Sequence, residues 1–248
     1  GHASEGAAFT KAGECAVLCL ACPHPGKNLL EDWCDTLSDK QWLYQLFIVI
    51  NVNFHLKHKK VLTDVCLNKG YTYFVDEKDY KMHLAKFDTL IHEDQSTCNN
   101  HNTVKSENLK KSTGTAASSV ITHDMKWPCS VGDLQKGERY ININYLFWSS
   151  LAKHTTADIV VSYDIACQWS TNIWAQFVRY NFIFDPTKCV FVFLMPKFHL
   201  PAHQQACQVG YLFNYTKQVG RTDGKAIEHS WSATNLFTSS TKEMGLGS

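Results

Sequence analysis

The chain carries almost no net charge and no long apolar run, and both absences restrict its function. Lysine and arginine together number 24 against 23 for aspartate and glutamate, which leaves a formal net charge of +1. A charge this small gives no overall basic field for nucleic acid, so any such binding must come from local patches. No apolar stretch is as long as a membrane-spanning helix, which needs about 18 residues, and the first residues do not have the pattern of a signal peptide. We therefore expect a cytosolic or nuclear protein.

Cysteine is too sparse for a disulfide scaffold, but cysteine and histidine together are plentiful. The 248 residues contain 10 cysteines and 12 histidines. Thiolate and imidazole are the usual ligands of zinc, so metal binding is the favoured interpretation. A hydrophobic content of 44% is sufficient for a substantial core and excludes a disordered chain.

Apolar periodicity divides the chain into a lead-in and an α/β unit. Residues 1–42 show little periodicity and form an irregular, cysteine-containing lead-in, whereas residues 43–248 alternate between strand-like and helix-like patterns. Apolar runs with β-branched or aromatic residues predict strands, at 44–51, 71–75, 160–163 and 189–198. Apolar residues at spacings of three and four predict helices, at 78–92, 138–153, 166–177, 199–209 and 223–235.

Residues 93–136 interrupt this pattern, because they are rich in serine, threonine, asparagine and glycine. We expect a long polar insertion there without a packed element. The order of the other elements predicts a mixed α/β sheet with flanking helices. The ribonuclease-H-like architecture has this order, and it brings acids together from the end of the first strand, the end of the fourth strand and the last helix.

Asp164 directly follows the strand at 160–163, and its ordinary role would be a helix cap or a turn. In a ribonuclease-H-like protein it would instead be one of the carboxylates that hold two divalent cations about 3.5–4 Å apart for phosphodiester cleavage. Mg²⁺ or Mn²⁺ suits such a site because both take oxygen ligands. The last predicted helix offers Glu228, with Asp223 beside it, and the first strand offers Asn51.

Several motifs resemble those of one family, the Kyakuja-Dileera-Zisupton (KDZ) transposases as found in mushroom-forming fungi. These motifs are "VVSYDIACQW", "PKFHLPAHQQAC", "SVGDLQKGERY" and "VGRTDGKAIEHSW". The start, "CAVLCLACPHPGKNL", resembles the segment that follows a CxC2-like cysteine cluster in such proteins. The resemblance covers essentially the whole chain. It implies a DDE-type, ribonuclease-H-like transposase core with inserted zinc-ligand pairs, acting on DNA in the nucleus.

The resemblance also implies roles for particular positions. Asp164 matches the second catalytic acid of the family, and Asn51 falls on the aspartate of a "DANF"-like motif. Glu228 matches one acid of a "DGE..E..W" pattern, in which Lys225 replaces the other glutamate, and which of these two positions binds metal is left open. An amide brings no charge and a lysine repels cations, so both departures oppose catalysis by this copy.

A row of ligands follows the last predicted strand. His199, His203 and Cys207 are spaced by four, so a helix would align them on one face, as in many zinc sites. Cys98 and His101, spaced C-x2-H in the polar insertion, could supply the other two ligands and hold that insertion. The alternative is that Cys207 and one histidine are simply buried in the core.

The lead-in contains the C-x3-C-x2-C start of a zinc knuckle, although an ordinary loop with free cysteines is nearly as good an interpretation. Its candidate ligands are Cys15, Cys19, Cys22, His24 and Cys34. His123 lies where the family often has a second C-x2-H pair, but Val120 occupies the cysteine position, so that pair is broken.

Two basic features could contact DNA phosphates, although each could also be a solvated surface. They are the run Lys57, Lys59 and Lys60, with His55 and His58, and the single residue Arg221.

The leading hypothesis is a DDE-type core that cuts and joins DNA with two divalent metal ions. The alternative is a non-catalytic, zinc-stabilised nucleic-acid-binding or interaction module derived from a transposase. A third, weaker reading is a zinc hydrolase that uses the His/Cys row. DNA is the expected partner, a homo-oligomer is left open, and no membrane is expected.

Overall fold

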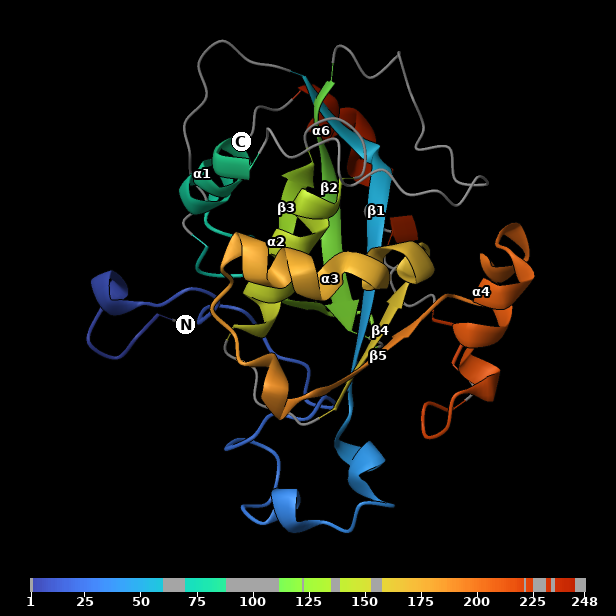
Figure 1. Ribbon diagram of the computed structural model, residues 1–248. Helices are drawn as coiled ribbons and strands as arrows, with labels where there is room; N and C mark the ends of the chain where they lie inside the picture. The colour runs from blue at the N-terminus through green and yellow to red at the C-terminus, as the bar shows by residue number, and fades with distance from the viewer. Residues whose placement is uncertain are drawn as a thin grey trace.

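A mixed sheet lies at the centre of the protein (Figure 1). The computed structural model describes residues 2–59, 70–87, 112–121, 123–134, 139–152, 158–220, 222–224, 231–232 and 235–243. Within these residues the sheet has five strands, β1 (Leu46–Lys59), β2 (Ser112–Ile121), β3 (Lys126–Leu134), β4 (Asp158–Tyr163) and β5 (Val190–Leu194). Their order across the sheet is β3-β2-β1-β4-β5, which places the long β1 in the middle.

β1 joins an antiparallel half of the sheet to a parallel half. It runs antiparallel to β2, which in turn runs antiparallel to β3. On its other side β1 runs parallel to β4, and β4 runs parallel to β5. The pairing of β1 with β4 covers Leu46 to Ile50 of β1, so the rest of β1 extends beyond the last residue of β4.

Helices of very different lengths surround the sheet. The α-helices within the described residues are α1 (Glu77–Phe87), α2 (Tyr140–Leu151), α3 (Ala166–Tyr180), α4 (Gln205–Gly210) and α6 (Thr238–Glu243). Short 3-10 turns are η1 (Ala7–Phe9), η2 (Trp33–Asp35), η3 (Gln41–Tyr44), η6 (Pro186–Lys188), η7 (Leu200–Ala202), η8 (Phe213–Tyr215) and η9 (Asn235–Phe237). In the part of the chain that the structure describes, no helix combines the length and apolar character needed to cross a membrane.

The two faces of the sheet are covered differently. In β1 the side chains alternate, and Ile48, Ile50 and Val52 join the large core beneath α1, α2 and α3. Figure 1 shows α2 and α3 lying across this face. On the opposite face a smaller apolar cluster includes Phe213 and Val219, from the segment that follows α4.

A buried polar link fixes α2 against α3. The Asn144 side chain accepts a hydrogen bond from the Trp169 indole N–H at 2.6 Å and donates one to Gln176 Oε1 at 2.7 Å. All three residues are buried, so each bond replaces water that the core excludes. Because α2 buries nearly its whole circumference, this link also sets its rotation about the helix axis.

The structure confirms most of the elements that sequence periodicity predicts and corrects three, one of which is the helix predicted at 199–209, where η7 and α4 are separate. The helices predicted at 78–92, 138–153 and 166–177 are α1, α2 and α3, with ends shifted by a few residues. The strand predicted at 71–75 is instead a bend with one isolated bridge, from Phe74 to Val131. The insertion predicted to lack packed elements contains both β2 and its partner β3, because backbone pairing on both sides of β2 needs no large apolar side chains.

Candidate functional site

Asn51 and Asp164 meet at the edge where β4 ends. Ile50 of β1 pairs with Tyr163, the last residue of β4, and the two strands run parallel. The residues that come next along the two strands, Asn51 after Ile50 and Asp164 after Tyr163, therefore lie at the same edge of the sheet. The carboxyl ends of parallel strands are where ligand sites of open α/β sheets form. The structure thus brings these two sequence-predicted residues to one edge.

Asp164 is not the cap that its position suggested. The N-cap of α3 is Ile165, and no side-chain cap hydrogen bond forms there. Asp164 Oδ1 accepts a hydrogen bond from the Ile165 N–H at 3.0 Å, and the residue is half-buried. A carboxylate just before α3 also lies at the positive end of the helix dipole, which stabilises its charge.

Asn51 is half-buried in the middle of β1. Its Oδ1 accepts a hydrogen bond from the Val52 N–H at 2.7 Å. Because neighbouring Ile50 and Val52 point into the core under the helices, Asn51 belongs to the opposite face. The side chain at this position contributes an amide dipole and no charge.

The C-terminal part of the chain crosses that same opposite face. Ser162 of β4 donates a hydrogen bond from Oγ to the Gly224 carbonyl at 3.3 Å, and Asn53 of β1 donates one from Nδ2 to Asn235 Oδ1 at 2.9 Å. Gly224 has φ +74°, and a Cβ there would lie 2.6 Å from Ser162 Oγ, so only glycine allows this approach. Gly224 therefore lies against β4, and Asn235 lies against β1.

Several predicted site residues lie outside the described residues. These are Glu228, Lys225, Arg221, Lys60, Cys98 and His101. The backbones of Lys57 and Lys59 belong to β1, where Lys57 pairs with Thr115 after one register shift and Lys59 pairs with Ser112 after a second.

The helix predicted to align His199, His203 and Cys207 is interrupted. The turn η7 ends at Ala202, His203 is extended with φ −101° and ψ 162°, and α4 begins only at Gln205. These three residues therefore do not share one helix face.

His203 instead approaches a cysteine of α3. It is buried, and its Nδ1 lies 3.4 Å from the Sγ of Cys167, which is also buried. Among the described residues this pair does not belong to a group of three metal-ligating side chains. The pair therefore ties the segment before α4 to α3.

A compact group of three potential metal ligands lies elsewhere, between the lead-in and the turn that joins β2 to β3. Cys19 and Cys22 are buried, and His123 is exposed. All three ligand atoms lie within 4.8 Å of one another. Burial, with a smaller contribution from the neighbouring Cys19, raises the pKa of the Cys22 thiol. This group could hold a metal such as zinc.

Sequence reasoning proposed two of the three members of this group as metal ligands. It singled out Cys19 and Cys22 but treated His123 as the remnant of a broken pair. Cys22 and His123 lie 101 residues apart, so their proximity is a tertiary fact. The only sequence signal was a C-x2-C spacing together with an unassigned histidine.

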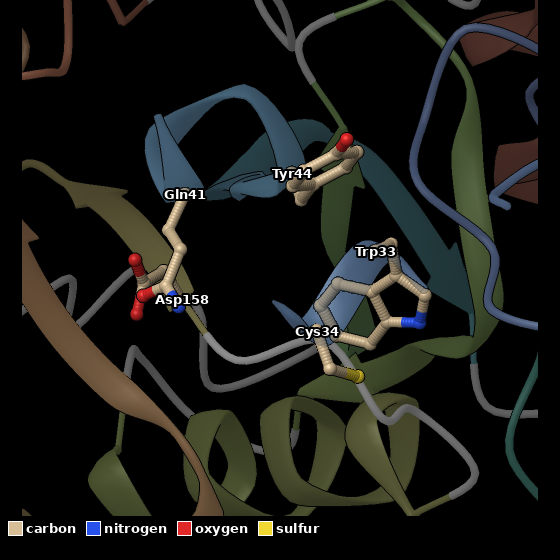
Figure 2. A pocket seen from close by; sticks show the side chains of 5 residues that line it. All are labelled: Trp33, Cys34, Gln41, Tyr44 and Asp158. Carbon is tan, nitrogen blue, oxygen red and sulfur yellow. The ribbon is translucent and has the colours of Figure 1, made fainter. Parts of the chain in front are cut away.

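A small cavity lies far from the Asp164 edge (Figure 2). Its volume is about 80 Å³, and its lining residues are Trp33, Cys34, Gln41, Tyr44 and Asp158. Asp158 begins β4 and Asp164 follows its end, so roughly 20 Å of strand separates them. A cavity of this size is too small for an organic substrate, since ligand pockets measure about 300–1,000 Å³.

Fold and site define a mixed α/β domain with an acid at the edge of a parallel sheet and a Cys/His group able to hold a metal. Residues 44–248 match the model of the family described as Kyakuja-Dileera-Zisupton transposase, and the chain belongs to this family. No curated protein and no solved structure matches the chain.

Proposed function

We propose that the chain forms the core of a DDE-type DNA transposase that cuts and joins DNA phosphodiesters in the nucleus. Membership of a transposase family supports a function on DNA. The observation that carries the site is the pairing of Ile50 with Tyr163, since it delivers Asn51 and Asp164 to one edge. The antiparallel β1, β2 and β3 followed by parallel β4 and β5 support a ribonuclease-H-like fold.

The described donors at this edge fit one divalent cation better than a close pair. They are the Asp164 carboxylate and the neutral Asn51 amide, whose oxygen already accepts the Val52 N–H. Two cations about 3.5–4 Å apart require several negative ligands to offset their repulsion. Bound Mg²⁺ or Mn²⁺ would supply Lewis acidity and charge neutralisation at the scissile phosphate. Asp164 would hold the cation and orient it.

Glu228 is the proposed further carboxylate. The chain lies against β4 at Gly224 and against β1 at Asn235, both on the face that carries Asn51. The intervening residues, which include Glu228 and Lys225, therefore connect two points of that face. A lysine at position 225 would repel the cation, and the neutral Asn51 supplies no negative charge to attract it.

Restoring the two acids tests this proposal. Supercoiled plasmid would be incubated with Mg²⁺ or Mn²⁺ and the wild-type protein, Asn51→Asp, or Asn51→Asp with Lys225→Glu. We expect the double variant to nick DNA about 10²-fold faster than the wild type, because each change adds negative charge where cations bind. Adding Asp164→Asn to the double variant should abolish the gain. A folded double variant with no metal-dependent nicking contradicts the acid site.

A second candidate function is a non-catalytic, zinc-stabilised module that binds nucleic acid or another partner. The neutral Asn51 and the group Cys19, Cys22 and His123 favour it. The same assay separates the two functions. Retained DNA binding, with no cleavage by the wild type and none by the restored double variant, supports the module and excludes the enzyme.

A further inference from the structure

We propose that Cys19, Cys22 and His123 bind one zinc ion, which fastens the lead-in to the turn between β2 and β3. The Cys19 Sγ lies 3.5 Å and the Cys22 Sγ 3.3 Å from His123 Nδ1. Zn–S bonds of about 2.3 Å and Zn–N bonds of about 2.0–2.1 Å at tetrahedral angles place sulfur and nitrogen about 3.5 Å apart. The side chains therefore already have the spacing of zinc ligands.

The donor set selects the metal. Two thiolates and one imidazole are soft to borderline ligands, which favour Zn²⁺ over the oxygen-seeking Mg²⁺ and Ca²⁺. Both cysteines are free thiols in the structure. Their burial disfavours two thiolates unless a cation offsets the charge, so metal binding also explains why two buried thiols face one imidazole.

Neighbouring side chains hold the C-x2-C loop in shape. The His24 ring nitrogen Nε2 lies 2.8 Å from the Cys19 carbonyl oxygen, and Asn28 donates from Nδ2 to the Cys22 carbonyl at 2.7 Å. The His24 ring stacks on Trp127 of β3, with centroids 5.3 Å apart and planes 10° apart. Such supporting contacts orient metal ligands and reduce the cost of organising them.

The proposed zinc joins a segment outside the matched family region to a residue within it. Cys19 and Cys22 precede the matched family region, which begins at residue 44, whereas His123 lies within it. In Figure 1 the blue lead-in runs from the left of the sheet to below it, at the end toward which the β2 arrow points. The ion would therefore fix a segment outside the family region onto the core sheet. This assignment does not depend on the proposed activity on DNA.

Zinc content measured by mass spectrometry on the purified full chain tests the site. His123→Ala is the main variant because its side chain is exposed, so its loss should not collapse the core. Cys22→Ser is the second variant, and Cys15→Ser and Cys34→Ser are matched controls from the same lead-in. We expect His123→Ala and Cys22→Ser each to lose one zinc per chain relative to the wild type, while both controls keep it.

Cobalt substitution provides an independent readout. The wild type and both controls should show a thiolate-to-cobalt charge-transfer band, which should weaken in Cys22→Ser and shift in His123→Ala. Unchanged zinc content in His123→Ala would overturn the proposal. A Cys19–Cys22 disulfide in protein purified under reducing conditions would overturn it as well, and so would equal zinc loss in the Cys15→Ser control.

Discussion

At the scale of single residues, His83 shows how an aromatic environment controls a charge. Its ring on α1 packs against Phe87, Tyr145, Tyr180 and Phe182, with centroids 4.8–5.5 Å away. Burial, and secondarily the nearby Lys86, lowers the pKa of His83 from 6.5 to about 4. The neutral imidazole therefore behaves as one more ring of the cluster.

This depressed pKa predicts a pH dependence of stability. Between pH 6.5 and 4 the unfolded chain binds a proton at His83 that the folded chain does not, so stability falls as the pH is lowered through this window. After allowance for partial exposure, we expect a loss of about 1–2 kcal/mol. Urea unfolding at a series of pH values measures it. His83→Phe should remove this part of the dependence, and an identical slope in that variant would contradict the assignment.

Asp164 shows how far a single sequence position can be interpreted. Sequence alone placed it directly after a strand, and the structure confirms that it follows the last residue of β4. Its neighbour across the sheet could not be derived from periodicity, because register between strands far apart in sequence depends on tertiary packing. The resemblance supplied Asn51, and the pairing of Ile50 with Tyr163 places it at the same edge.

At the scale of elements, the polar link between α2 and α3 predicts a large cost of removing one side chain. Asn144→Ala would leave the Trp169 N–H and Gln176 Oε1 without their buried bonds to Asn144 and would open a small cavity. We expect a loss of about 2–4 kcal/mol in the free energy of unfolding. Asn172→Ala is the matched control, because Asn172 is exposed on α3 and should change stability by less than about 0.5 kcal/mol. Equal effects of the two changes in urea unfolding would refute the role of Asn144.

The elements that sequence predicted well are those with strong apolar patterns. β5 and the helix α3 carry large apolar residues at regular spacing, so burial alone identifies them. β2 reads "STGTAASSVI", and its small polar residues look like a loop. It is a strand because β1 and β3 pair with its backbone on both sides, which is information that no local pattern contains.

At the scale of the whole molecule, we propose that DNA binds across the Asp164 edge and along the part of β1 that extends beyond β4. Asn51 lies beside the end of β4, and Lys57 and Lys59 follow it along the same strand. Lys40 precedes β1, so it lies at the other end of a strand of 14 residues, roughly 45 Å long. DNA bound across the Asp164 edge would therefore lie nearer the backbone positions of Lys57 and Lys59 than that of Lys40.

This polarity predicts an asymmetric effect of charge removal on DNA affinity. Replacing Lys57 and Lys59 by glutamine should weaken DNA binding and lower the slope of log K against log salt by about 1 for each lost phosphate contact. The pair Lys27→Gln and Lys40→Gln removes the same charge from exposed positions in the lead-in and should leave the slope unchanged. Fluorescence anisotropy over a range of salt concentrations measures both. If the lead-in pair changes the slope as much as the β1 pair, binding reflects overall charge, and the sheet edge is not the DNA surface.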